Sequence, residues 1–353
     1  MSIIFAILLF SVLIFVHELG HFVAAKLSGV QVNEFSMFMG PAIWKKQKGE
    51  TLYTLRCIPI GGYCAMEGEE EDTDNPRSFQ KAAWWKRLII LVAGAAMNFV
   101  AGLLLLLIVY APAEQFAVPV VDYFEEGCAL YGEDGLMEGD RILELDGEKI
   151  YVASDFSTIL SLNSGDVHDL VVGRNGEKIV LDDFVMEKRE FPDGNGGTSL
   201  RYGFNFAVEK ATLGSKLKYV WNTAIDTVRI VRLSLQMLLT GQAGIQDMGG
   251  PVMIVDQMNQ VAEASASTYD AVMNMLYFGG FIAINLAVMN LLPIPALDGG
   301  RVVCLLITTA VEAVTKKKID PKYEGYLHGA GMILLLALMA VIMFKDIFVI
   351  FKR

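Results

Sequence analysis

Four long apolar segments constrain the fold more than any other feature of this sequence. They cover about residues 3–25, 88–111, 271–292 and 327–344. Each approaches the roughly 20 residues that an α-helix needs to cross a hydrocarbon core of about 30 Å. Because lipid offers the backbone no hydrogen-bond partners, such segments are expected to be helical. With 54% of its 353 residues hydrophobic, the chain is expected to be a polytopic α-helical membrane protein with four transmembrane helices.

The first and third apolar segments each need an interpretation. The N-terminal run has no preceding Lys or Arg and no Ala-x-Ala pattern, so we expect it to remain as the first span rather than to be cleaved as a signal peptide. The third run is followed by Pro-Ile-Pro-Ala-Leu-Asp-Gly-Gly at 293–300, which interrupts a helix. The next apolar run, 301–310, is short for a crossing, so we predict one span with an unwound end.

Charge predicts the orientation of the chain and the chemistry of its partners. Basic residues gather in the connections 26–87 and 312–326, which we therefore place in the cytoplasm, with the N-terminus outside. Residues 112–210 contain 21 Asp and Glu against 8 Lys and Arg, and this segment falls outside as well. Such an acidic block repels nucleic acid, so no nucleic-acid partner is expected. The expected surroundings are the lipid bilayer.

The segments between the spans predict three further elements. Strand-like runs alternate with Gly, Asn and Asp turns in the acidic block, which favours one small β-rich domain at 112–213. Residues 214–240 have the apolar periodicity of a long helix, which we place along the outer membrane surface. Residues 51–71 predict a β-hairpin around Gly61-Gly62. The predicted domains are therefore 1–111, 112–213 and 214–353.

Three polar residues inside the first apolar segment indicate chemistry. His17, Glu18 and His21 form the pattern His-Glu-x-x-His. Positions i and i+4 share a helix face, so both imidazoles can reach one Zn²⁺ ion, while Glu18 lies beside the metal and can accept a proton from water. Polar groups at membrane depth cost several kcal/mol, so they usually mark a functional site.

A catalytic zinc site needs a third protein ligand and an open fourth position. Asp298 is the only carboxylate between Asp270 and Glu312, and it lies where the third span is broken. We expect it to be the third ligand. Two alternatives stay open: Asp298 could form a turn and pair with Arg301, and His328 could be the ligand, although its position favours an interfacial residue.

The remaining histidine and the four cysteines carry weaker signals. His168 lies in the acidic block and is expected at the surface. The cysteines lie in segments of different character and show no Cys-x-x-Cys pattern, which argues against a disulfide framework and against a cysteine zinc site.

The combination of HELGH in the first span with NLLPIPALDGGR in a late span resembles the site-2 protease family of intramembrane zinc metalloproteases. The order of the parts resembles its bacterial regulated-intramembrane-proteolysis branch, as do IPIGGY and RSFQKAAWWKRLIILVAGAAMNF. The resemblance implies that His17, His21 and Asp298 hold zinc and that Glu18 is the general base. It also implies that the 51–71 hairpin enters the membrane from the cytoplasmic side and presents a strand edge to substrate.

The inserted domain carries a resemblance of its own. Residues 127–150 resemble a PDZ domain through Gly135-Leu136, Gly139-Asp140, Ile142 and Asp146-Gly147. About 100 residues leave room for one such domain, on the extracytoplasmic side. A PDZ domain can bind a peptide as an added strand.

The expected function is hydrolysis of peptide bonds within the spans of single-span proteins that have been trimmed outside the membrane. The resemblance suggests anti-sigma factors and remnant signal peptides as substrates, and a multi-pass location in a bacterial cytoplasmic membrane. Asn290 is expected either to bind substrate or to make a contact between helices. The residues expected to bind substrate are Asn290, Pro293, Pro295, Gly61, Gly62 and Asn98. The alternative function is a non-proteolytic, zinc-binding membrane PDZ adaptor, which would have no need of Glu18.

Overall fold

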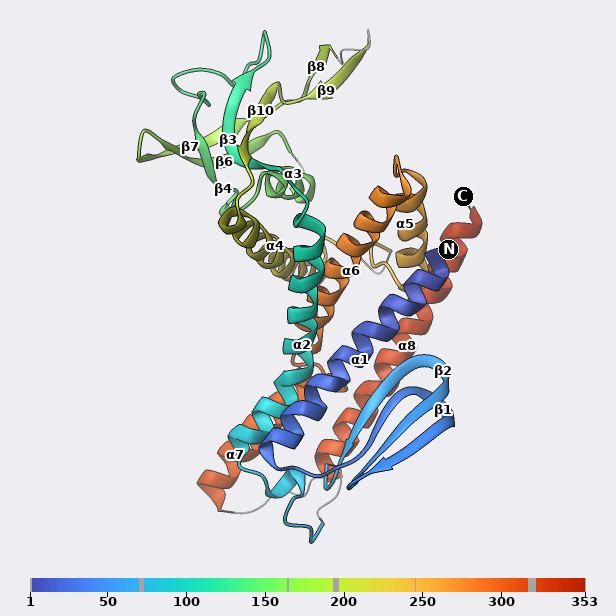
Figure 1. The fold of residues 1–353 in the computed structure, drawn as a ribbon. Helices are drawn as coiled ribbons and strands as arrows, with labels where there is room; N and C mark the ends of the chain where they lie inside the picture. The colour runs from blue at the N-terminus through green and yellow to red at the C-terminus, as the bar shows by residue number, and fades with distance from the viewer. Residues whose placement is uncertain are drawn as a thin grey trace. The chain divides into compact units, whose positions relative to one another are not determined.

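The computed structural model divides the chain into two compact units (Figure 1). The first contains Met1–Val109 and Thr227–Arg353, and the second contains Tyr110–Asp226. The structure describes residues 2–69, 73–163, 165–192, 197–244, 246–316 and 322–352. Residues 70 and 71 of the predicted 51–71 hairpin therefore lie outside the described residues.

The first unit contains the helices that the apolar segments predict. They are α1 (Ser2–Ser28), α2 (Trp84–Tyr110), α6 (Thr268–Asn290) and α8 (Lys322–Lys352). In the described part of the chain, four helical stretches are long and apolar enough to cross a membrane: Ile4–Ser28, Trp84–Tyr110, Thr268–Asn290 and Lys322–Val349. The four predicted spans are confirmed to this extent.

The third span ends where the proline-rich segment predicts. Helix α6 stops at Asn290, residues 291–297 form a non-helical link, and α7 (Asp298–Thr315) begins directly after it. Helix α7 is not among the helices apolar enough to cross a membrane. The prediction of one span followed by a break is therefore confirmed, and Asp298 lies in the first turn of the helix after the break.

Two further helices lie between the β-strands of the second unit and α6 in the chain. Helix α4 (Leu213–Thr240) matches the predicted long helix at 214–240. Helix α5 (Pro251–Glu263) is an element that the sequence analysis missed. Its N-terminus is capped by a residue of α8: Asp346 Oδ2 accepts hydrogen bonds from the backbone N–H of Gly250 at 2.9 Å and of Met253 at 3.2 Å.

The reversal predicted around Gly61-Gly62 is present, but the strand segments on either side of it pair with an earlier strand and not with each other. Strand β1 (Val32–Lys48) pairs with β2 (Thr51–Met66), and the chain reverses at Gly49-Glu50. Gly61 and Gly62 lie inside β2, near a second reversal of the chain, because residues 52–55 and 62–65 pair with the same stretch of β1, residues 34–37, in opposite order. The turn between β1 and β2 forms at Gly49 because its φ of 62° suits a residue without a Cβ. Figure 1 shows this sheet curling beside α1.

Glycine lets the spans approach one another closely. A Cβ on Gly20 of α1 would lie 2.4 Å from the carbonyl oxygen of Ala93 in α2. A Cβ on Gly102 of α2 would lie 3.0 Å from the carbonyl oxygen of Gly280 in α6. Small residues at such positions are the usual means by which membrane helices pack backbone to backbone. These glycines therefore allow α1 to pack closely against α2, and α2 against α6.

The second unit is β-rich, as predicted. Its main sheet has the strand order β10-β3-β4-β6-β7, with β5 pairing with β4, and β8 and β9 form a separate pair. The core includes Leu136, Ile142, Leu145, Leu170 and Val172. The elements are β3 (Gln115–Phe124), β4 (Arg141–Leu145), β5 (Glu148–Lys149), α3 (Ala153–Leu162), β6 (Val167–Arg174), β7 (Glu177–Val185), β8 (Arg189–Pro192), β9 (Thr198–Arg201) and β10 (Phe204–Lys210).

His168 is buried in this unit, so the prediction of a surface residue is wrong. Only 4% of the residue is exposed. Its Nδ1 lies 2.8 Å from Asp146 Oδ2, and its Nε2 lies 3.1 Å from the carbonyl oxygen of Gly165. Both ring nitrogens thus lie within hydrogen-bond distance of protein oxygen atoms, which offsets the cost of burying a polar ring and is not visible in the sequence pattern.

Candidate metal centre

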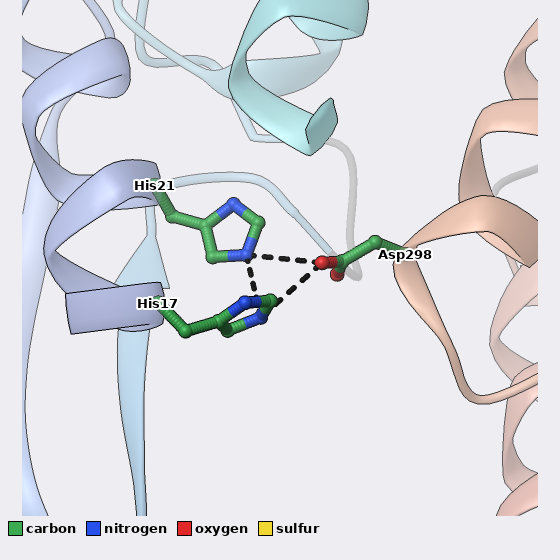
Figure 2. A group of neighbouring side chains, drawn as sticks. All are labelled: His17, His21 and Asp298. Atoms are coloured by element: carbon green, nitrogen blue, oxygen red, sulfur yellow. Dashed lines mark hydrogen bonds and ion pairs between the residues drawn. The ribbon is translucent and has the colours of Figure 1, made fainter. Parts of the chain in front are cut away.

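Three side chains from helices far apart in the sequence converge in the first unit. His17 and His21 project from one face of α1 toward Asp298 at the start of α7 (Figure 2). The Nε2 atoms of His17 and His21 are 3.2 Å apart, and they lie 3.2 Å and 3.3 Å from Asp298 Oδ2. The three ligand atoms therefore form a nearly equilateral triangle.

The size of this triangle fits a zinc ion. Bonds of about 2.0–2.1 Å in tetrahedral geometry place two ligand atoms about 3.3–3.4 Å apart. Asp298 Oδ2 is buried and has no hydrogen-bond donor among the described residues. A buried carboxylate oxygen without a donor is costly unless a cation meets it. Two imidazoles and one carboxylate, with a fourth position open, match the ligand set of a catalytic zinc site.

Helix α2 fixes the orientation of His21. The Nδ1–H of His21 donates to the carbonyl oxygen of Ile90 at 2.8 Å, so Nε2 keeps its lone pair for the centre of the triangle. Gly94, one turn further along α2, leaves room for both rings. A Cβ at Gly94 would lie 2.3 Å from His21 Nε2 and 2.7 Å from His17 Cε1. The AGAA segment of α2 therefore shapes the site.

Asn290, the last residue of α6, lies beside His17. The side-chain nitrogen of Asn290 is 3.5 Å from His17 Nδ1. A histidine that ligates through Nε2 carries its proton on Nδ1 and needs an acceptor there. The oxygen and nitrogen of a side-chain amide exchange places by a half-turn, and the turned amide of Asn290 offers that acceptor. Of the two expectations for Asn290, the structure favours a contact between helices, made to a candidate ligand.

The link between α6 and α7 folds tightly over the residues that follow Asp298. A Cβ on Gly299 would lie 2.2 Å from the carbonyl oxygen of Leu291, and a Cβ on Gly300 would lie 2.3 Å from that of Ile294. The Asp-Gly-Gly sequence is thus needed to let the link pass this close. Arg301 donates to Glu69 Oε1. The alternative in which Arg301 pairs with Asp298 is therefore not the arrangement observed.

A cavity of about 700 Å³ opens beside the three candidate ligands. Glu18 lines it together with the candidate ligands, as expected. Residues 63–66 of β2 form one part of its wall. The wall also contains residues that the sequence analysis did not single out, among them Glu69, Arg301 and Met332. The sequence shows both the acidic run after Gly68 and the arginine after Asp-Gly-Gly. It does not show that they pair across more than 200 residues.

The other predicted substrate-binding residues take different positions. Gly62 packs against α1, where its Cβ would lie 3.4 Å from Glu18 Cγ, whereas Gly61 faces Met39. Asn98 is buried in α2, one turn beyond Gly94. Pro293 and Pro295 belong to the link between α6 and α7. None of these residues lines the 700 Å³ cavity in the described part of the chain.

Residues 5–338 match the family described as Peptidase family M50. The chain belongs to this family. It is therefore a zinc metalloprotease of the site-2 protease type, and its cofactor is zinc. Family membership, together with four helices long and apolar enough to cross a bilayer, identifies a multi-pass membrane protein.

Several relatives of known name match the chain along nearly its whole length. A Clostridium perfringens protein, provisionally named as a zinc metalloprotease, is 38% identical over 349 residues, which are 98% of each chain. The zinc metalloprotease RasP of Oceanobacillus iheyensis is 29% identical over 427 residues, with 97% of each chain covered. The regulator of sigma-W protease RasP of Bacillus subtilis is 26% identical over 431 residues, with 98% of each chain covered.

Proposed function

We propose that this M50 metalloprotease cleaves peptide bonds inside the lipid bilayer, with His17, His21 and Asp298 as zinc ligands and Glu18 as general base. The observation that carries the proposal is the ligand triangle, in which both histidines project from a helix that can span a membrane. His17 lies 13 residues after Ile4, where the first candidate span begins, which is about 20 Å along the helix. A water-dependent reaction is thus assigned to a site deep in the apolar part of the chain.

The protein side of the reaction is proton transfer and positioning. When bound, zinc supplies a Lewis acid that polarises the peptide carbonyl and acidifies water. Glu18 lines the cavity beside the candidate ligands and accepts a proton from the attacking water. The water oxygen adds to the carbonyl carbon, the C–N bond breaks, and Glu18 returns the proton to the leaving amine. The carboxylate thereby ends the cycle in its starting state.

Strand β2 is proposed to hold the unwound substrate. Residues of a membrane helix lose their backbone hydrogen bonds when they are unwound for cleavage, at a cost of several kcal/mol for each unsatisfied group. Residues 62–65 of β2 pair only with β1 among the described strands, so their other edge is open. Because residues 63–66 also line the cavity, a substrate added as a strand would gain backbone partners next to Glu18.

The proposed substrates are single-span membrane proteins already trimmed outside the membrane. Anti-sigma factors and remnant signal peptides remain the candidates, and the name of the Bacillus subtilis relative, regulator of sigma-W protease, supports the first of these. We place the β-rich second unit outside a bacterial cytoplasmic membrane. We propose that it is a single PDZ domain that either docks the trimmed substrate or excludes untrimmed ones.

Reconstitution into liposomes with a single-span substrate tests this function. Glu18→Gln removes the base without removing a candidate ligand, so cleavage should slow by about 10²–10⁴-fold while bound zinc is retained. Glu138→Gln, at an exposed glutamate of the second unit, is the matched control and should cleave at the wild-type rate. Unchanged cleavage by a zinc-loaded Glu18→Gln protein would contradict the proposal.

A further inference from the structure

His328 of α8 contacts the link that precedes Asp298. Its Nδ1 accepts a hydrogen bond of 3.0 Å from the backbone N–H of Ala296. A ring that accepts at Nδ1 carries its own proton on Nε2. Neither nitrogen then has a free lone pair for a metal, which argues against His328 as the third ligand. The side chain is only 11% exposed, so the contact is shielded from solvent.

Ala296 has a backbone conformation that needs outside support. Its φ is 84°, in the left-handed region that residues with a Cβ rarely adopt. Strained positions of this kind persist only when their surroundings hold them in place. Ala296 lies two residues before Asp298, and Leu297 between them is the N-cap of α7. The conformation at Ala296 therefore sets the direction in which α7 and its first side chain begin.

A second contact from the same face of α8 holds the same link. Gly331 lies three residues after His328, about one helical turn, so the two point the same way. A Cβ on Gly331 would lie 2.5 Å from Pro295 Cβ and 2.6 Å from the carbonyl oxygen of Pro295. Helix α8 thus supports Pro295 by close packing and Ala296 by a hydrogen bond.

We propose that His328 is a positioning residue for the metal centre: its hydrogen bond to Ala296 holds the link in the conformation that directs the Asp298 carboxylate toward His17 and His21. The inference rests on the proposed ligand role of Asp298. It gives the last span a part in building the site, although α8 supplies no candidate ligand among its described residues. Partners that act behind a ligand commonly contribute about 10–100-fold in metal affinity.

The experiment compares metal binding by full-length variants in detergent. His328→Leu removes the acceptor, whereas His328→Asn places an amide oxygen close to the position of Nδ1 and keeps it. Zinc affinity is measured by competition with a chelator, and ligand geometry by the visible absorption spectrum of the cobalt-substituted protein. Tyr326→Leu, at an exposed position two residues away on α8, is the control. We expect His328→Leu to bind zinc about 10–100-fold more weakly with an altered cobalt spectrum, and His328→Asn and Tyr326→Leu to match the wild type.

Two further variants keep the test decisive. Gly331→Ala displaces Pro295 while leaving His328 in place, and it should alter the cobalt spectrum in the same direction as His328→Leu. Wild-type affinity and spectrum in a folded His328→Leu protein would overturn the inference, as would an equal loss in His328→Asn. Asp298→Ala separates the two proposals: if it leaves zinc affinity unchanged, the ligand assignment itself fails, whereas a loss there with an unaffected His328→Leu refutes only the role of His328.

Discussion

The chain contains two clusters of histidine and aspartate with opposite hydrogen-bond balance. In the second unit, His168 uses both ring nitrogens, and Asp146 accepts from His168, from the Asn163 side chain and from the Asp169 amide. In the first unit, His17 and His21 direct their Nε2 atoms at Asp298 Oδ2, which has no donor within the described residues.

A metal site can be recognised from the hydrogen-bond partners of its side chains before any metal is seen. Each cluster contains one buried histidine, His21 or His168, and both contain the residue types that bind zinc. The cluster around His168 is closed because Asp146 has three protein partners and both ring nitrogens of His168 lie against protein oxygen atoms, so the protein itself surrounds the polar atoms. The cluster around Asp298 is open because three acceptor atoms face a common point, and only a cation can satisfy all three.

The largest predicted difference is in zinc content, between a variant that lacks His21 and a variant that lacks His168. His21→Ala deletes a ligand, so we expect zinc to be lost from the purified protein and cleavage to fall by more than about 100-fold, since the loss of an outer partner alone costs about 10–100-fold. His168→Ala should keep a full zinc content, because its ring only joins protein groups. Elemental analysis measures the zinc content of both proteins. Loss of zinc from both would contradict the assignment of only the first cluster to zinc.

A substitution at Asn290 tests whether this residue orients His17 in the open cluster. Asn290→Ala removes the group that lies against His17 Nδ1, so zinc affinity should fall by about 10-fold through loss of ring orientation. Asn274→Ala is the control on the same helix, where the side chain bonds Ser265 far from the site. Chelator competition measures both affinities. Equal affinities in the two variants would show that Asn290 does not orient the ligand.

Asp146→Ala should reduce the stability of the closed cluster and should not change the zinc content. The substitution leaves Nδ1 of the buried His168 ring without its carboxylate partner, which costs about 1–3 kcal/mol. Hydrogen exchange of the full-length protein should show faster exchange in residues 165–170, with unchanged zinc content. Asp122→Ala, at an exposed position of the same unit, serves as the control. Unaltered exchange in the Asp146 variant would show that the cluster contributes no stability.

The smallest effect is the pH dependence of the closed cluster. Burial raises the pKa of Asp146, but hydrogen bonds from His168 and from the Asp169 amide outweigh it and hold the pKa below its usual value. A lowered carboxyl pKa stabilises the fold above the unfolded value of about 3.9, and that stability is lost as the pH falls through the folded pKa. Exchange protection at Asp169, corrected for the intrinsic rate, should hold down to about pH 4 and then decline. In Asp146→Asn this decline should be absent.

Much of the fold of the first unit could be predicted because its determinants are local. The length of each apolar run determines a span, and the two prolines after Leu292 determine where α6 must stop. The hairpin predicted at 51–71 lacked its partner strand, because β1 lies earlier in the chain and its register with β2 is irregular. Helix α5 escaped notice because its N-terminal cap comes from Asp346, almost 100 residues later.

The candidate site, too, could be predicted from the sequence only where its residues follow a local pattern. The histidine spacing predicts two candidate ligands on one helix face, and Asp298 is identifiable as a lone carboxylate in an apolar stretch. The supporting contacts of Asn290, Glu69 and His328 join segments that only the tertiary fold brings together. A pattern within one segment can thus locate a reactive group, whereas the groups that orient it depend on packing between helices.

We propose that His17, His21 and Asp298 share one zinc ion, and X-ray absorption at the zinc edge of the full-length protein tests this ligand set. We expect nitrogen and oxygen scatterers at about 2.0–2.1 Å, with the outer-shell signal of two imidazoles, and the loss of one imidazole in His21→Ala. A sulfur scatterer at about 2.3 Å would point to cysteine and refute the proposed ligands, as would an imidazole signal that persists unchanged in His21→Ala.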